Sequence, residues 1–149
     1  MPSYREQKET IEELVARIND TWSRSRWSPI RYRYGSWERS ELLAQYRAVD
    51  VALVTPINDG MNLVAKESCA ANQGTGVLIL SAFAGAAGEL GGGALLVDPR
   101  NPQAVAKALR TAHRMPARER FERMKTLKAV VREQSVHDWV ESFLERTRE

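Results

Sequence analysis

The sequence predicts an α/β protein built on an open sheet of parallel strands, and three observations lead to this class. Short apolar runs at residues 50–56, 76–81 and 94–97 have the length and near-continuous hydrophobicity of strands buried on both faces of a sheet. Segments with apolar residues at helical spacing lie between and after these runs. Turn residues separate the two kinds of segment, as at residues 58–60. Strands that alternate with helices form crossover units, which are right-handed and join parallel strands.

The part of the chain before these runs is predicted to hold a helix, a loop, a short strand and a second helix. The first helix covers Tyr4 to Ile18, where one apolar stripe runs along a charged surface. Residues 19–29 read as a loop, residues 30–35 as a short strand, and residues 40–49 as a helix. The stripe of the first helix consists of Ile11, Leu14, Val15 and Ile18. Such a stripe normally packs on a larger sheet, and where that sheet is missing we expect an exposed apolar patch with weak oligomerisation or poor solubility.

The central part of the chain alternates the three strands with turns and one clear helix. Pro56 closes the first strand, and a helix is expected over Asn62 to Ala71 after the turn at residues 58–60. A Gly/Ala-rich stretch, residues 85–93, leads from the second strand into the third. We expect all three strands to be buried, as in a parallel sheet covered by helices.

Helices end the chain. Pro102 stands where the first turn of a helix tolerates proline. Two further helices are predicted over residues 117–133 and 135–146. The inward faces of the first and last of these three helices are predicted to be Val105, Ala108, Leu109 and Ala112, and then Val136, Trp139, Val140 and Phe143.

The composition excludes several classes of function. With 149 residues, of which 43% are hydrophobic and 28% charged, the chain suits one globular domain. Its 22 Lys and Arg residues are mixed with 19 Asp and Glu residues along the helices, so no basic face for nucleic acid is expected. No apolar run is long enough to cross a membrane, no signal peptide is recognisable, and Cys69 is the single cysteine. We therefore expect a cytoplasmic protein with neither a membrane nor a nucleic-acid partner.

The residues most often used in metal sites and nucleophilic catalysis are predicted to be structural here. Cys69 falls in a predicted helix and reads as a buried, inert thiol. His113 and His137 lie on predicted helices without the carboxylates or cysteines that would complete a metal site. Neither histidine accompanies a nucleophile elbow. We expect no metal and no cofactor.

Three loops are candidate ligand sites, because ligands of open α/β sheets bind outside the carboxyl ends of the strands. They are residues 58–62, residues 81–89, and the turn near Asp98. The small residues of the second loop allow close approach either to a ligand or to neighbouring backbone.

The first loop carries the most chemistry. It joins a strand to a helix, so free N–H groups and the positive end of the helix dipole would meet a diphosphate there. Gly60 would let the backbone approach a ligand, Asp59 would accept hydrogen bonds from sugar hydroxyls, and Glu67 would accept them from a ribose. Pattern alone favours the structural interpretation: a turn at Asp59-Gly60, a helix cap at Asn62, and a solvated Glu67.

Two longer stretches are more specific. The run YRAVDVALVTP, from Tyr46 to Pro56, and the run DGMNLVAKE, from Asp59 to Glu67, resemble the signature of trehalose-6-phosphate synthases. The similarity extends to residues 27–32, 80–81 and 83–87 and to His137 and Trp139. It therefore covers nearly the whole chain.

Members of that family have two Rossmann-like domains, and they transfer glucose from UDP-glucose to glucose-6-phosphate with retention at the anomeric carbon, giving trehalose-6-phosphate. The resemblance implies that residues 1–149 are the C-terminal, donor-binding part of this two-domain glycosyltransferase fold. It implies that the N-terminal acceptor domain, which binds most of the sugar phosphate, is absent. We expect the isolated chain to be inactive, and an oligomer is possible.

The resemblance also assigns the donor-binding residues. Asp59 would be the catalytic acidic residue that bonds the donor glucose, and Glu67 would hold the ribose. The nucleobase slot matches Trp37 and Leu42. The backbone that contacts glucose and diphosphate would be that of Gly60, Met61, Asn62 and Leu63.

Departures from the family pattern leave alternatives open. Asn58 stands where an arginine is usual, and Ala82 where a glutamate is usual. The arginine and lysine that the family uses on the diphosphate would precede this chain. A glucosylglycerol-phosphate synthase-like enzyme would share this donor site, and a catalytically silent nucleotide-sugar-binding or regulatory module would keep only the fold and pocket. UDP is the expected donor nucleotide, with ADP and GDP as alternatives.

Overall fold

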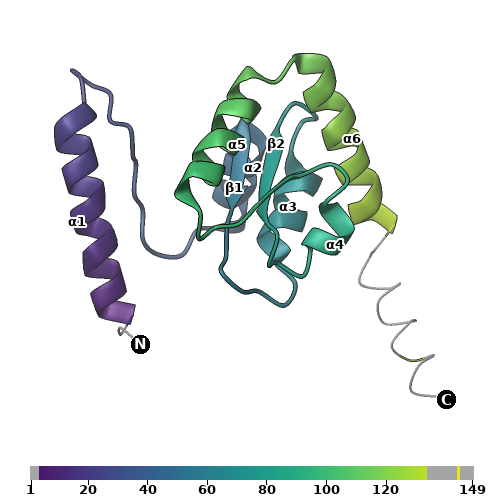
Figure 1. Cartoon of the computed structure of the whole chain (residues 1–149), viewed down its shortest axis with the longest axis horizontal. Helices are drawn as coiled ribbons and strands as arrows, with labels where there is room; N and C mark the ends of the chain where they lie inside the picture. The colour runs from purple at the N-terminus through teal and green to yellow at the C-terminus, as the bar shows by residue number, and fades with distance from the viewer. Residues whose placement is uncertain (1–3, 134–143, 145–149) are drawn as a thin grey trace. The chain divides into compact units, whose positions relative to one another are not determined.

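The structure, a computed structural model, describes residues 4–133 and residue 144 (Figure 1). It contains two compact units, Met1–Trp37 and Glu38–Glu149. The helix predicted over residues 135–146, with His137 and Trp139, lies outside the described residues apart from Leu144.

The first unit is a helix followed by irregular chain. Helix α1 spans Tyr4–Trp22, so it ends at Trp22 rather than at the predicted Ile18. The strand predicted over residues 30–35 was wrong, because that segment has no strand partner among the described residues. The Asn19 side chain takes the place of a neighbouring strand: it donates to the carbonyl of Ile30 at 2.9 Å and accepts from the Ile30 N–H at 3.0 Å.

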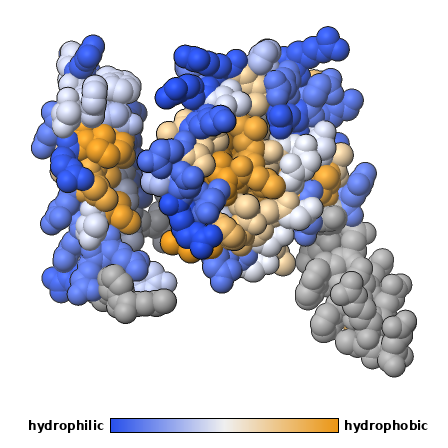
Figure 2. All heavy atoms as spheres, in the orientation of Figure 1, coloured by the Kyte–Doolittle hydropathy of each residue, from blue (hydrophilic) through white to orange (hydrophobic). Residues whose placement is uncertain are grey.

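The apolar stripe of α1 is largely exposed within this unit. Ile11, Leu14 and Ile18 are 44%, 41% and 37% exposed, and α1 has no buried residue. Figure 2 shows the apolar residues gathered along this helix. The exposed patch that the sequence predicted is therefore confirmed, and self-association through it stays a prediction.

A three-stranded parallel sheet in the order β1-β2-β3 forms the centre of the second unit, as predicted. Strand β1 is Val51–Val54, β2 is Val77–Ser81 and β3 is Leu95–Val97. Val51 pairs with Val77, and Ile79 pairs with Leu95. The carboxyl ends of all three strands therefore meet at one edge of the sheet.

Helices connect these strands in the alternating order that the sequence predicted. Asn62 caps the helix after β1, and Asn101 caps the helix that begins at Pro102. The short helix after β2 was not predicted, because Gly88 and Gly91 lower the helix propensity of that stretch. The helices are α2 (Arg39–Ala48), α3 (Leu63–Ala71), α4 (Ala87–Leu90), α5 (Pro102–Arg114) and α6 (Ala117–Glu133).

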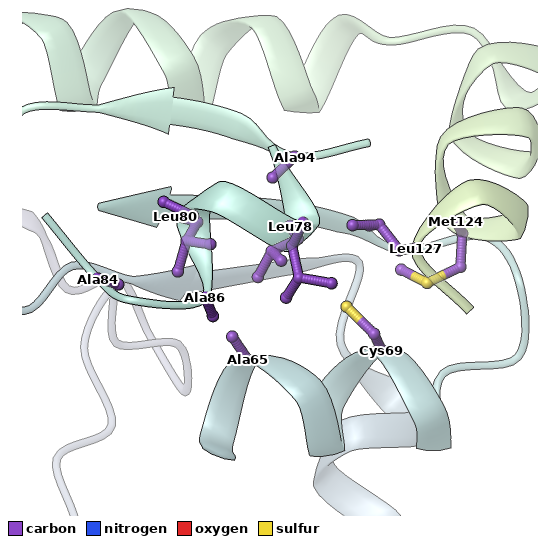
Figure 3. Close-up of a cluster of buried hydrophobic side chains, with 11 residues drawn as sticks. Ala65, Cys69, Leu78, Leu80, Ala84, Ala86, Ala94, Met124 and Leu127 are labelled. Atoms are coloured by element: carbon purple, nitrogen blue, oxygen red, sulfur yellow. The ribbon is translucent and has the colours of Figure 1, made fainter. Parts of the chain in front are cut away.

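Two apolar clusters cover the two faces of the sheet. On one face, Leu78 and Leu80 of β2 pack against α3, α4 and α6, with Cys69 fully buried among them (Figure 3). On the other face, Val77 and Ile79 pack against α5. Alternate residues of β2 thus feed opposite clusters, so β2 is buried along its whole length.

Two burial predictions were wrong. Strands β1 and β3 are only partly buried, with Leu53 44% and Leu96 47% exposed, because each has a neighbouring strand on one side only among the described residues. On α5, Ala108 and Ala112 are buried as predicted, but Leu109 is 38% exposed. Leu109 follows Ala108 on the helix and is turned about 100° away from it.

Candidate functional site

Two loops lie side by side at the carboxyl edge of the sheet. We call residues 55–62, which follow β1, the first loop, and residues 82–86, which follow β2, the second loop. Their backbones bond directly: the N–H of Gly85 donates to the carbonyl of Asp59 at 2.8 Å, and the N–H of Ala86 donates to the carbonyl of Met61 at 2.9 Å. The two loops therefore act as one structural unit, with the first loop held in place by the second.

Gly85 is required by this contact. A Cβ atom at Gly85 would lie 2.0 Å from the carbonyl oxygen of Gly60, well inside van der Waals contact. The close approach predicted for the second loop is thus an approach to the first loop. At Gly60 itself a Cβ atom would meet no heavy atom within 4 Å, so the space above Gly60 is open.

The carboxylate of Asp59 organises the first loop. One oxygen accepts from the N–H of Met61 at 3.1 Å, and the other accepts from the side-chain amide of Asn62 at 2.9 Å. The bond from Met61, and then the bond from Asn62, lower the pKa of Asp59 below its ordinary value. Asp59 is therefore ionised at neutral pH, and each oxygen keeps further lone-pair capacity for a ligand hydroxyl.

Helix α3 begins directly at this loop. Asn62 adopts a left-handed backbone conformation with φ of 71°, and its side chain accepts from the N–H of Ala65 at 2.9 Å. The cap role that the residue pattern favoured for Asn62 is confirmed, whereas the plain turn expected at Asp59-Gly60 is a bend in which Asp59 bridges to Ala84. The first helical residues, Leu63 and Val64, are 59% and 47% exposed. Their N–H groups have no preceding helical turn to accept them, so the loop presents the positive end of α3 to solvent.

A cavity lies between α2 and α3. It has a volume of about 320 Å³ and contains both Leu42 and Glu67, which the sequence analysis had assigned to base and ribose. Tyr46 of α2 donates from its hydroxyl to Glu67 at 3.4 Å across the cavity. Burial, and then the charge of Glu67, raise the pKa of Tyr46. The remaining lining residues are Arg39, Leu43, Arg47, Ala70 and Ala71.

Trp37 belongs to the first unit rather than to this cavity's unit. The guanidinium group of Arg33 lies over its ring, 3.8 Å from the centroid. The role of Trp37 at the nucleobase stays a prediction.

The comparisons with known proteins can now be set against this geometry. The family model described as glycosyltransferase family 20 matches residues 1–149. The chain belongs to glycosyltransferase family 20.

Two curated members of family 20 indicate the range of activities among its relatives. The trehalose-6-phosphate synthase of Enterobacter sp. (strain 638) is 42% identical over 144 residues, which are 95% of this chain and 30% of the relative. The glucosylglycerol-phosphate synthase of Pseudomonas anguilliseptica is 40% identical over 147 residues, which are 97% of this chain and 19% of the relative. The chain thus spans less than a third of the length of these relatives.

Solved structures with the same fold include ligand complexes. The α,α-trehalose-phosphate synthase (UDP-forming) of Burkholderia xenovorans, in complex with glucose-6-phosphate, matches with a TM-score of 0.94 and 40% identity, over 100% of this chain and 33% of that one. The E. coli trehalose-6-phosphate protein bound with UDP-2-fluoro glucose matches with a TM-score of 0.93 and 38% identity, over 98% of this chain and 33% of that one. The predicted Rossmann-like fold is confirmed.

The sequence analysis missed Arg100, which links the turn after β3 to the second loop. The guanidinium group of Arg100 lies over the ring of Phe83, 4.3 Å from its centroid, and pairs with Asp98 at 3.1 Å. The hydrogen bond from the Arg100 side chain is the largest cause that lowers the pKa of Asp98. Arg100 thus ties the turn after β3 to the second loop. The available signal was an acid and a base two residues apart at a strand end.

The groups predicted to be structural agree with the fold. Cys69 is fully buried, and burial raises its pKa to about 11, so its thiol is protonated at neutral pH. His113 is exposed on α5. In the described part of the chain, no three His, Cys, Asp or Glu residues gather as metal ligands, and no helix has the length and apolar character needed to span a membrane.

Proposed function

We propose that this chain provides the donor-binding part of a retaining glycosyltransferase that transfers glucose from a nucleotide sugar, UDP-glucose first, to a sugar phosphate. One observation carries the proposal. Helix α3 has its positive end at the first loop and places Glu67, four residues further on, in the cavity beside Leu42. A single helix therefore offers an anion site and a hydroxyl acceptor about 6 Å apart along its axis.

This separation suits the parts of a nucleotide sugar. The ribose hydroxyls would bond Glu67, with the base in the cavity between α2 and α3 and in reach of Leu42. The diphosphate would lie at the N–H groups that begin α3. Gly60 has open space above it, so the glucose would lie over the first loop and bond Asp59. The support for this arrangement is that the ionised Asp59 keeps acceptor capacity while its loop is already fixed.

The chemical contribution of these residues would be binding, orientation and charge stabilisation. As the bond from the anomeric carbon to the diphosphate breaks, negative charge grows on the leaving group next to the positive end of α3. Asp59 would orient the glucose through its hydroxyls. We propose that polypeptide outside residues 1–149 binds the acceptor sugar phosphate and supplies the cationic side chains that assist the leaving group, so transfer by this chain alone is not expected.

The deciding experiment is calorimetric titration of the folded chain with UDP, ADP, GDP and UDP-glucose. We expect saturable binding of one nucleotide and of its nucleotide sugar. Asp59→Ala should weaken binding of UDP-glucose about tenfold or more, and Glu67→Ala should weaken binding of both UDP-glucose and UDP by that factor. The matched control is Glu122→Ala on α6, an exposed acid outside the site, which should bind like the parent chain. Equal affinity in all variants would refute the site.

Two alternative functions can be distinguished from the proposed one by experiment. A silent nucleotide-sugar-binding module is favoured by Asn58 and Ala82, which depart from the family pattern in the two site loops. Supplying the separately expressed acceptor half of a trehalose-6-phosphate synthase tests it, because a silent module would bind donor yet never restore transfer. A glucosylglycerol-phosphate synthase-like enzyme would restore transfer to glycerol-3-phosphate instead of glucose-6-phosphate.

A further inference from the structure

The two site loops continue side by side into the helices that follow them. The backbone bonds from Gly85 to Asp59 and from Ala86 to Met61 join the loops themselves. Beyond them, Lys66 of α3 reaches Glu89 of α4, with 2.5 Å between the ammonium nitrogen and the carboxylate oxygen. The Lys66–Glu89 ion pair therefore joins the helices that follow the two loops, just beyond the backbone bond between Ala86 and Met61.

The apolar packing behind these loops is thin. Ala65 of α3 lies close to Ala86 of the second loop, in the buried cluster that also includes Ala84 (Figure 3). Such small side chains let the two backbones approach closely, but each buries only one methyl group. The alanines therefore add little apolar area of their own, and polar links contribute part of the constraint on the loops.

The Lys66–Glu89 pair is better shielded than the Arg5–Glu9 pair on α1. Its side chains are 18% and 36% exposed, whereas those of Arg5 and Glu9 on α1 are 89% and 58% exposed. Shielding from water reduces screening and favours a persistent geometry. The pair also joins two different helices, while Arg5 and Glu9 lie on one helix and constrain nothing beyond it.

Helix α3 thereby points two neighbouring residues in two directions. Lys66 faces α4 and the second loop, and Glu67 faces Tyr46 of α2 across the cavity. Successive residues of a helix project about 100° apart, which permits this division. One side of α3 is fixed to the loops, and the other side lines the cavity proposed for the nucleoside.

We propose that the Lys66–Glu89 ion pair is a clamp that holds the first and second loops in register, and so positions Asp59 for the sugar of the bound nucleotide sugar. The inference rests on the proposed function. Neither residue contacts the donor in this arrangement; both are positioning residues. The clamp should therefore affect the sugar end of the ligand more than the nucleoside end.

The first test needs no ligand. Amide hydrogen exchange is measured by NMR on the full chain and on Lys66→Met, Glu89→Gln and the charge-swapped double variant Lys66→Glu/Glu89→Lys. We expect protection of the Gly85 and Ala86 amides to fall about fivefold in the single variants, and to recover in the double variant. The control is Glu119→Gln, which removes the Arg123–Glu119 pair on α6 and should leave both amides unchanged. Unchanged protection in the single variants overturns the clamp.

The second test links the clamp to the donor through the ratio of two affinities. In Lys66→Met we expect the Kd for UDP-glucose to rise about fivefold and the Kd for UDP to change less than about twofold, with recovery in the double variant. A merely structural role would weaken both ligands in parallel with a lower Tm, and this result overturns the clamp. If the parent chain binds no nucleotide, the proposed function fails, while the exchange test still decides on the clamp.

Discussion

The two sides of helix α3 are built by different kinds of interaction. On the loop side, backbone bonds of 2.8 and 2.9 Å and an ion pair fix the first loop against the second. On the cavity side, Tyr46 of α2 and Glu67 of α3 are joined by one hydroxyl-to-carboxylate bond of 3.4 Å. Backbone bonds tolerate little variation, while side chains reorient freely. The loop side is therefore preorganised, and the cavity side can adjust to its ligand.

This difference orders the expected effects of substitution, and Gly85→Ala should have the largest. Its new Cβ atom would lie 2.0 Å from the Gly60 carbonyl oxygen, so the loops must separate. We expect a loss of stability of about 1–3 kcal/mol and at least a tenfold loss of UDP-glucose affinity. Thermal unfolding and calorimetry measure the two effects.

Gly88→Ala on α4 is the matched control, because a Cβ atom there meets no heavy atom within 4 Å. Alanine in that helix should leave stability equal or raised by up to about 1 kcal/mol. If both substitutions destabilise equally, loop pairing is not the reason that Gly85 is needed.

Asp59→Asn should come next. The amide would present a donor either to the Met61 N–H or to the Asn62 amide, so one of the two bonds is lost. We expect UDP-glucose affinity to fall about tenfold, with a smaller loss for UDP. Glu122→Gln on α6 is the control, since it removes an exposed carboxylate outside the site. An equal loss in both variants would indicate a general charge effect.

The lowered pKa of Asp59 also predicts a pH dependence. The ionised carboxylate is stabilised in the folded chain, so its contribution is present above the ordinary Asp pKa of about 3.9 and is lost as pH falls through the lower folded value. Exchange protection of the Met61 amide should therefore persist at pH 5. Loss of that protection between pH 6 and 5, in a chain that stays folded, would contradict the role given to Asp59.

The strands and the helices α3 and α5 at this edge were predictable from sequence, but α4 and the contacts between the elements were not. The apolar runs, Pro102 and the cap at Asn62 follow from local chemistry, which is why the strands and helices agree with the sequence analysis. That Gly85 meets Gly60, or that Lys66 meets Glu89, depends on which loops become neighbours. The edge position of β1 likewise reflects neighbouring strands rather than its own apolar residues.

On the cavity side, Glu67 is expected to discriminate between ribose and deoxyribose. A carboxylate that accepts from two ribose hydroxyls loses one partner when the 2′-hydroxyl is absent, which costs about 1–3 kcal/mol. UDP should therefore bind more tightly than 2′-deoxy-UDP in calorimetry. Glu67→Ala should remove the difference while leaving the preference for UDP over the other bases. Equal binding of both nucleotides by the parent chain would make Glu67 an ordinary surface residue.

Tyr46→Phe should have the smallest effect, and it tests whether the side chains on the cavity side of α3 can reorient around a ligand. Its hydroxyl donates over a long 3.4 Å distance, and Glu67 is exposed, so water replaces the lost bond. We expect UDP affinity to change by less than about threefold, corresponding to a bond of roughly 0.5 kcal/mol. A tenfold loss would mean that Tyr46 fixes Glu67 as firmly as the backbone bonds fix the loops. The two sides of α3 would then be equally preorganised, and the whole donor site would be rigid before ligand arrives.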